Sequence, residues 1–152
     1  MNIITNPRIS GTTFIYPHKS LDEGLAIAAS HGFRTVDVGV GGRNGHLPPR
    51  DVAKDPQRFA AQVREAVEKR DMAVNECFTL NFGPPINDPS AAVREETNRL
   101  FAGLAEFAQA TGFRSILLIP GPIHPQLGQQ RSLDLAVEAF SALIDIASAH
   151  GL

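Results

Sequence analysis

Five histidines supply the side chains of this sequence that are best suited to acid–base or metal chemistry near neutral pH. His18, His46 and His124 fall in predicted loops that follow strands, whereas His31 and His150 fall at predicted helix ends. A positive charge is favourable at the C-terminal end of a helix, so we interpret His31 and His150 as structural. Loops after strands often carry function, which makes the other three candidates for a site, with an ordinary solvated role as the alternative.

Two carboxylates and one amide extend this set of candidate residues. Asp37 and Glu76 lie inside apolar segments that read as buried strands, where a charge needs a partner. Each carboxylate either points into a polar site or pairs with an arginine such as Arg34 or Arg114. Asn81 follows the strand of Glu76 and either hydrogen-bonds a substrate hydroxyl or forms a turn.

Two other features argue against cofactor and metal sites. The glycine-rich run at residues 39–45 is followed by Leu47-Pro48-Pro49 and not by a helix start, which disfavours a dinucleotide-binding loop. Cys77 has no cysteine or histidine at metal-ligand spacing and is predicted to be a buried core thiol. The sequence therefore predicts no metal site and only weak metal binding by this chain alone.

A repeated strand–loop–helix unit positions these residues. Helix-to-strand junctions occur at Gly32, near residue 72, at Gly112 and at Gly151, which gives four units of about 40 residues. This alternation predicts an α/β fold of parallel strands joined by right-handed helical crossovers. A closed (β/α)8 barrel needs about 250 residues, so we expect the N-terminal half of a TIM barrel with four βα units. A small open α/β sheet is the alternative.

Start and stop signals set the expected element boundaries. The predicted strands span residues 9–16, 35–40, 73–80 and 115–119, with loops at 41–50, 81–87 and 121–131. A capping box formed by Ser20 and Glu23 begins the first helix. Asp-Pro pairs at residues 55–56 and 88–89 begin the second and third helices, the latter running to about residue 111. Ser132 is expected to cap the fourth helix. Its predicted inward residues are Val137, Phe140, Ile144 and Ala147.

The bulk composition excludes several classes of protein. The formal charge is −2 without a basic block, so we expect no nucleic-acid partner. No apolar run approaches the ~20 residues that cross a bilayer, and residues 1–10 lack a secretory signal, so we expect no membrane association. A single cysteine suits a reducing, cytoplasmic setting.

Three segments carry a family resemblance: SLDEGLAIAASHGFRTVDV (20–38), DPSAAVREETNRLFAGLAEFAQATGFRSILLIPGP (88–122) and the final SLDLAVEAFSALIDIASAHGL. They resemble the xylose isomerase-like TIM-barrel superfamily, which holds sugar (phosphate) isomerases and epimerases and endonuclease IV-type enzymes. The resemblance implies a single domain over residues 1–152, apparently incomplete at its C-terminal end. It also implies a divalent metal (Mn²⁺, Mg²⁺ or Co²⁺) held by residues of strands five to eight, and two glutamates that move a proton.

No residue of this chain matches those metal ligands or glutamates, so the catalytic residues are expected beyond residue 152. The resemblance does imply which residues line a sugar pocket. These are Tyr16, His18, Asp37, His46, Asn81 and His124. The endonuclease branch resembles a family with an H-x-P-Y histidine after an early strand, whereas here the third strand ends in FTLNFGPP, which disfavours a hydrolase of that type.

Two functional hypotheses follow. The first is a sugar or sugar-phosphate isomerase/epimerase that uses metal-assisted proton transfer next to a carbonyl, although this chain alone is expected to be inactive. The second is a non-catalytic half-barrel that self-associates or binds a partner. Because the edges and inner faces of a lone half-barrel are uncovered, we expect a homodimer of four plus four strands or pairing with a missing C-terminal half.

Overall fold

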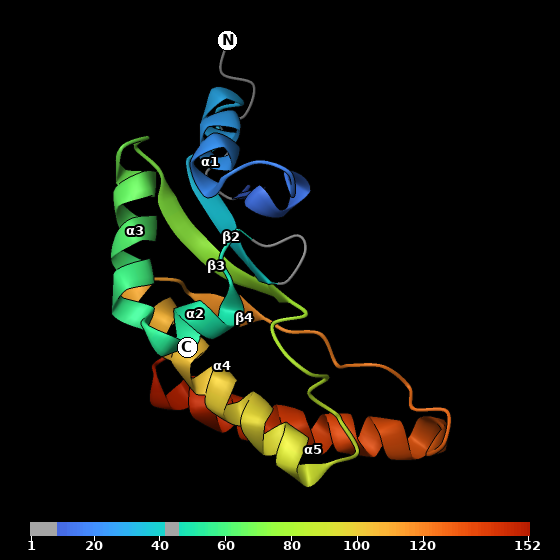
Figure 1. The fold of residues 1–152 in the computed structure, drawn as a ribbon. Coiled ribbons are helices and arrows are strands. Elements are labelled where there is room, and N and C mark those ends of the chain that lie inside the picture. The colour runs from blue at the N-terminus through green and yellow to red at the C-terminus, as the bar shows by residue number, and fades with distance from the viewer. Residues whose placement is uncertain (1–8, 42–45) are drawn as a thin grey trace.

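The computed structural model describes residues 9–41 and 46–152, which contain one four-stranded parallel sheet. In chain order the elements are β1 (Gly11–Thr12), the 3-10 helix η1 (Thr13–Ile15), α1 (Leu21–Ser30), β2 (Thr35–Gly41), α2 (Pro49–Lys54), α3 (Pro56–Glu68), β3 (Ala73–Leu80), α4 (Ala91–Thr111), β4 (Ser115–Leu117) and α5 (Gly128–Ala149). The strands follow the order β1-β2-β3-β4, and every neighbouring pair is parallel, which confirms the predicted arrangement (Figure 1).

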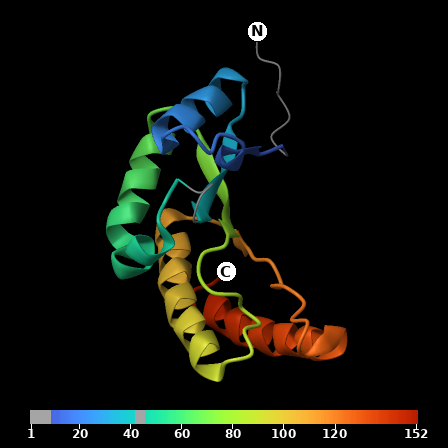
Figure 2. The ribbon, with the colours of Figure 1, turned by 45° about the vertical axis from the view of Figure 1, so that its right-hand side comes forward.

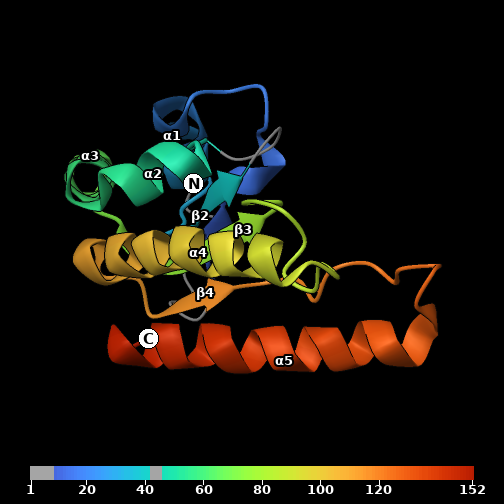
Figure 3. The ribbon, with the colours of Figure 1, turned by 60° about the horizontal axis from the view of Figure 1, so that its bottom comes forward.

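The helices cover one side of the sheet. Figure 2 shows α1, α3, α4 and α5 in an arc around the strands, with the sheet on the concave side of the arc. Figure 3 places α1 and α5 at opposite ends of the sheet, with α5 outermost beyond β4. This arrangement is that of half of a (β/α)8 barrel, in which helices form the outer ring around the strands.

The hydrophobic core lies between the strands and this helical layer. Val36, Val38 and Val40 of β2 are fully buried, because alternate residues of a strand point to the same face. Leu25 of α1 and Phe101 of α4 are also fully buried in this core. Asp37 and Gly39, at the intervening positions of β2, belong to the concave face.

Local signals set several helix ends as predicted. The Ser20 Oγ accepts a hydrogen bond from the Glu23 backbone N–H, and a Glu23 carboxylate oxygen accepts one from the Ser20 N–H, which completes the capping box. The Asp55 carboxylate caps α3. Gly112 ends α4 with φ of 93°, a left-handed conformation in which glycine carries no Cβ penalty.

The two edge strands are shorter than predicted. The residues expected to extend β1 to Tyr16 instead turn into η1, whose first turn is capped by the Thr12 hydroxyl accepting from Phe14 N–H. The hydroxyl of Thr13 accepts from Gly39 N–H, so this side chain fastens η1 to β2. β4 stops at Leu117 and not at residue 119. An edge strand has a partner on one side only, so apolar sequence alone overestimates its length.

The structure of the loop after β2 and the start of α4 were also predicted wrongly. Part of the segment expected as loop is the short helix α2, which begins with Pro49 at its first position; residues 42–45 of that segment lie outside the described part. Helix α4 begins at Ala91 and not at the Asp88-Pro89 pair, because the Asp88 carboxylate accepts from Ser90 N–H in a turn that precedes the helix.

Helix α5 departs most from expectation. Ser132 is not its cap, since the helix begins at Gly128 and the Ser132 hydroxyl donates to the Gly128 carbonyl inside the first turn. Val137 and Ile144, predicted to face inward, are 67% and 59% exposed, whereas Leu135 and Leu143 are buried. No helix of residues 9–41 and 46–152 combines the length and apolar character that crossing a membrane requires.

Candidate functional site

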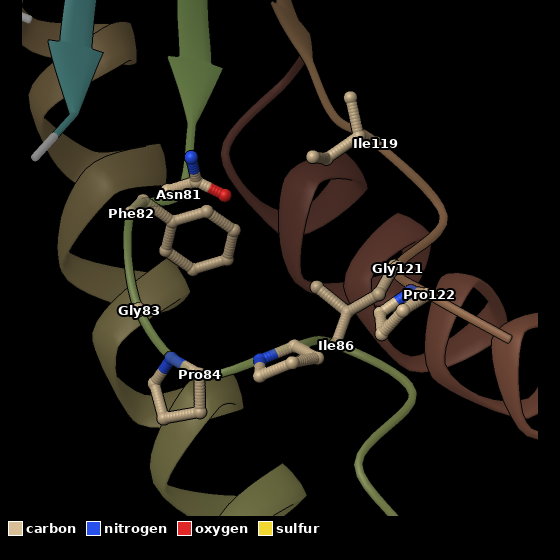
Figure 4. Close-up of a pocket in the computed structure, with 9 residues that line it drawn as sticks. Asn81, Phe82, Gly83, Pro84, Ile86, Ile119, Gly121 and Pro122 are labelled. Atoms are coloured by element: carbon tan, nitrogen blue, oxygen red, sulfur yellow. The ribbon is translucent and has the colours of Figure 1, made fainter. Parts of the chain in front are cut away.

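A cavity lies at the edge where the carboxyl ends of β3 and β4 meet. It has a volume of about 390 Å³, within the range of roughly 300–1,000 Å³ typical of small-molecule sites. Its walls come from two loops that follow the strands (Figure 4). The lining residues are Asn81, Phe82, Gly83, Pro84, Pro85, Ile86, Ile119, Gly121 and Pro122. None of these nine is charged, so the cavity suits a neutral group with an apolar face.

Asn81 is the polar residue on the wall of this cavity. It is the first residue after β3 and has φ of 53°, a left-handed conformation that asparagine adopts more readily than most residues. Its side chain is drawn beside the Phe82 ring in Figure 4. A side-chain amide offers both a donor and an acceptor, which are the groups that recognise a hydroxyl.

The fully buried side chain of Asn87 joins the two loops that form the cavity. Its amide nitrogen donates to the Pro122 carbonyl at 2.8 Å and to the Ser132 carbonyl at 3.3 Å. A Cβ on Gly121 would collide with this side chain, so the close approach of the loops needs glycine there. Asn87 therefore fixes the distance between the opposing walls.

His124 belongs to the same junction. Its ring Nε2 lies 3.0 Å from the Asn87 carbonyl oxygen, and its backbone N–H donates to the Ser132 hydroxyl at 2.9 Å. A carbonyl oxygen only accepts, so Nε2 carries the proton in this contact. His124 thus stands beside the cavity and helps hold its loops, although it does not line the wall.

His46 fastens a different pair of elements. Its Nε2 lies 2.8 Å from the Thr13 carbonyl oxygen, and its backbone N–H donates to the Gly39 carbonyl at 3.1 Å. The ring also lies against Gly24 of α1, where an added Cβ would be 3.6 Å from Nε2. The side chain therefore ties the segment after β2 to η1 and α1, outside the cavity.

Tyr16 and His18 follow η1 at the far end of the sheet from the cavity. Tyr16 is half-buried and ends the 3-10 turn through its N–H bond to the Thr13 carbonyl. His18 is exposed in the turn before α1. Both lie beyond the carboxyl end of β1, as the sequence predicts, but neither lines the cavity.

Asp37 lies near the amino end of β2, away from the edge of the sheet that carries the cavity. Its carboxylate Oδ1 accepts from the Ser10 hydroxyl at 2.9 Å and from the Asn75 amide at 2.8 Å, which links β2 to the residues before β1 and to β3. Four residues separate it from the end of β2, which is about 13 Å along a strand. Glu76 accepts from Ser115 Oγ on β4 at 3.0 Å.

The alternative prediction, that Asp37 and Glu76 pair with an arginine, is wrong for the described ion pairs. Arg34 instead pairs with Asp71 at 3.2 Å. Among the described ion pairs none involves Asp37 or Glu76, whose polar partners are hydroxyl and amide groups.

Cys77 is fully buried, as predicted. Burial, with a smaller contribution from the charge of Glu76, raises the pKa of its thiol far above the ordinary value. The thiol therefore has the character of a core side chain and not of a nucleophile.

Of the six residues predicted to line a pocket, Asn81 alone lies on the wall of this cavity, and His124 stands next to it. Phe82, Ile86 and Ile119 line the wall although the sequence did not single them out. The signal that could have found them is the apolar, proline-rich composition of both loops immediately after a strand. Within the described part of the chain, no three His, Cys, Asp or Glu side chains gather in a way that could hold a metal ion.

A parallel sheet with sequential strands, an outer layer of helices and a cavity at the carboxyl ends defines half of a TIM-type barrel. Comparison with models of protein families identifies which family of TIM barrels the chain belongs to. Residues 25–152 match the family described as "Xylose isomerase-like TIM barrel", and the chain belongs to it. No curated protein sequence matches this chain.

Solved structures agree with that assignment at the level of the fold. A D-tagatose 3-epimerase-like protein superposes with a TM-score of 0.73 at 16% identity, covering 94% of this chain and 49% of its own. A D-allulose 3-epimerase from Methylomonas sp. gives 0.68 at 16% identity, covering 100% and 51%. A D-psicose 3-epimerase gives 0.62 at 13% identity, covering 90% and 46%. This chain therefore spans about half the length of these similar structures.

Proposed function

We propose that this chain forms the sugar-binding half of an isomerase or epimerase that moves a proton next to a carbonyl group. The observation that carries the proposal is the cavity of about 390 Å³ at the carboxyl ends of β3 and β4, the edge at which TIM-barrel enzymes bind their substrates. The family membership and the epimerase titles of the similar structures support the reaction class.

The chemistry of the cavity wall supports a sugar as ligand. A sugar ring presents C–H groups on its faces and hydroxyls around its rim. Phe82, Ile86 and Ile119 offer apolar surface to such a face, while the Asn81 amide can pair with a hydroxyl. The similar structures are named for D-tagatose, D-allulose and D-psicose, so we take a ketohexose as the substrate class of this proposal.

The proton transfer itself is assigned to groups outside the described site. A divalent metal, Mn²⁺, Mg²⁺ or Co²⁺, would act as a Lewis acid on a carbonyl or enediolate oxygen in an enzyme of this type. The described residues do not fit a metal, since they bring no three ligands together. Because this chain spans about half of the similar structures, we assign the metal and the general acid and base of the proposal to the other half of such a barrel and derive no step through them. A cytoplasmic location completes the proposal, because a single buried cysteine suits a reducing compartment.

A second candidate function, ligand binding without turnover, is favoured by one observation. His46 and His124 each use Nε2 on a backbone carbonyl, at 2.8 and 3.0 Å. Both rings thereby act as ties between loops, which suits a binding scaffold.

Ligand-observed saturation-transfer NMR with D-fructose tests sugar binding at the cavity. We expect transfer to the sugar with wild-type protein, and about threefold to tenfold weaker binding after Asn81→Gly, which removes one hydrogen-bonding amide while keeping the left-handed backbone accessible. Asn98→Ala on α4 is the control and is expected to bind as wild type. Equal affinity of wild type and Asn81→Gly, or no transfer at millimolar sugar, contradicts the proposal.

A further inference from the structure

The wall of the cavity changes in chemical character from its mouth to its floor. Asn81 is exposed, and its amide is the polar side chain at the mouth. Phe82 and Ile86 are only 7% and 4% exposed and form the floor. Figure 4 shows these three residues on the loop after β3, with Ile119 and Pro122 on the opposite loop. A ligand therefore meets a hydrogen-bonding group at the mouth and hydrocarbon at the floor.

The backbone of the two loops adds little polarity to this floor. Pro84, Pro85 and Pro122 line the cavity and have no N–H group to donate. The Pro85 carbonyl accepts from the Asp88 N–H at 3.0 Å, and the Pro122 carbonyl accepts from the Asn87 amide at 2.8 Å. Both oxygens are thus engaged within the protein. A ligand hydroxyl at the floor would exchange its water partners for hydrocarbon, which is unfavourable.

Packing against α4 holds the floor in place. The Phe82 ring lies on the Phe101 ring of α4, with centroids 6.0 Å apart and a tilt of 49° between the rings. Gly83 follows, and an added Cβ there would come within 2.9 Å of the Leu100 side chain of α4. The loop after β3 is therefore pressed against a helix, so its apolar surface is formed before a ligand binds.

The cavity also provides no positive charge for an anionic ligand. None of its nine lining residues is charged. Two basic side chains beside the loops point to backbone carbonyls instead. Arg94 donates to the Asp88 and Pro89 carbonyls at 2.7 and 3.2 Å, and His124 Nε2 lies 3.0 Å from the Asn87 carbonyl oxygen. A phosphate group in this cavity would be desolvated without a counter-charge, which is strongly unfavourable.

We propose that the ligand class of this cavity is the neutral 6-deoxyketohexoses, which carry a methyl group where D-fructose carries its terminal hydroxymethyl group. The inference rests on the proposed function, in which the carbonyl chemistry belongs to the other half of the barrel, so the end of the sugar far from the carbonyl faces this cavity. The methyl group fills the floor between Phe82 and Ile86, and a hydroxyl nearer the carbonyl pairs with the Asn81 amide at the mouth.

Saturation-transfer NMR titrations of the full chain with sugars that differ at one end test this preference. We expect 6-deoxy-D-fructose to bind about tenfold more tightly than D-fructose, because an apolar pocket disfavours an added hydroxyl by about this factor or more. We expect 1-deoxy-D-fructose, which lacks a hydroxyl at the other end, to bind no more tightly than D-fructose. D-Fructose 6-phosphate should bind at least about tenfold more weakly than the 6-deoxy sugar.

Two matched variants assign the preference to the cavity. Ile119 and Ile123 are both exposed on the loop after β4, at 40% and 57%, but only Ile119 lines the cavity. Ile119→Asn adds an amide to the wall and should reduce the ratio of the two affinities, 6-deoxy-D-fructose over D-fructose, at least about threefold. Ile123→Asn should leave this ratio unchanged. Free sugars have the same ring forms whichever variant is present, so differences in ring form cancel when ratios are compared. Circular dichroism confirms that both variants remain folded.

The outcomes separate this inference from the proposed function. If D-fructose binds and 6-deoxy-D-fructose binds equally or more weakly, the preference is wrong while sugar binding stands. The same conclusion follows if D-fructose 6-phosphate binds as tightly as the 6-deoxy sugar, or if Ile119→Asn and Ile123→Asn change the affinity ratio equally. If none of the sugars binds at millimolar concentration, both the preference and the proposed function are wrong.

Discussion

Replacing Asn87 with alanine should release the two loops that form the cavity. The side chain is 1% exposed and donates to the Pro122 and Ser132 carbonyls at 2.8 and 3.3 Å. Two such hydrogen bonds contribute about 1 kcal/mol each, and the Pro122 oxygen loses a buried donor, so we expect the free energy of unfolding to fall by about 2–3 kcal/mol. The contact between His124 and the Asn87 backbone survives the change, which confines the loss to the side chain.

Urea denaturation followed by circular dichroism measures this loss. Wild type and variant are compared at one protein concentration, because association would otherwise shift the apparent stability. Asn98→Ala, an asparagine replacement on α4, is the control and should change stability by less than about 0.5 kcal/mol. If Asn87→Ala is as stable as this control, the loops are held together by other contacts and Asn87 does not join them.

Two further substitutions test local features of the fold. The Ser20 backbone N–H, then the Ser20 hydroxyl and the charge of Lys19, lower the pKa of Glu23. The charged form of Glu23 therefore stabilises the folded state at pH values above the usual carboxyl pKa. This contribution is lost as the pH falls through the lower pKa that Glu23 has in the folded state. Glu23→Gln should remove that part of the pH dependence in thermal melts from pH 6 to 3. Gly103→Ala should destabilise the protein by about 1 kcal/mol or more, because the new Cβ would lie 2.6 Å from the Ala53 carbonyl oxygen. This clash outweighs the higher helix propensity of alanine, which by itself favours the helix by about 1 kcal/mol. A more stable Gly103→Ala variant in urea denaturation would show that α2 moves away from α4 without cost.

The repeat was predictable because it rests on local signals. Gly32 and Gly112 end helices with φ of 90° and 93°, and the sequence marks both junctions directly. Alternation of strands and helices then restricts the topology to sequential parallel strands. The capping box at Ser20 is equally local, since its partner lies three residues away.

The edges of the sheet were less predictable, because strand length depends on partners. Thr12 and Thr13 use their side chains to cap and anchor η1, which ends β1 after two residues. Helix α5 has apolar residues on more than one side, and periodicity does not show which side is buried. Val137 and Ile144 were predicted to face inward for this reason, although they are 67% and 59% exposed.

The candidate site was predictable in position but not in detail. The rule that function collects beyond strand ends selected Asn81, which lines the cavity, and His124, which stands beside it. The contact of Asn87 with Pro122 spans 35 residues of sequence, so no local pattern announces it. Asp37 was chosen because it is a carboxylate in a strand, and its partners Ser10 and Asn75 come from other parts of the sheet.

Binding of a sugar by the loops after β3 and β4 can be located on the protein by an amide-resolved NMR titration with D-fructose. We expect the largest chemical-shift changes on residues 81–87 and 119–124, and no change in the amino-terminal half of β2. Shift changes centred instead on the amino ends of the strands, around Ser10 and Asp37, or no change at all, would contradict sugar binding by these loops.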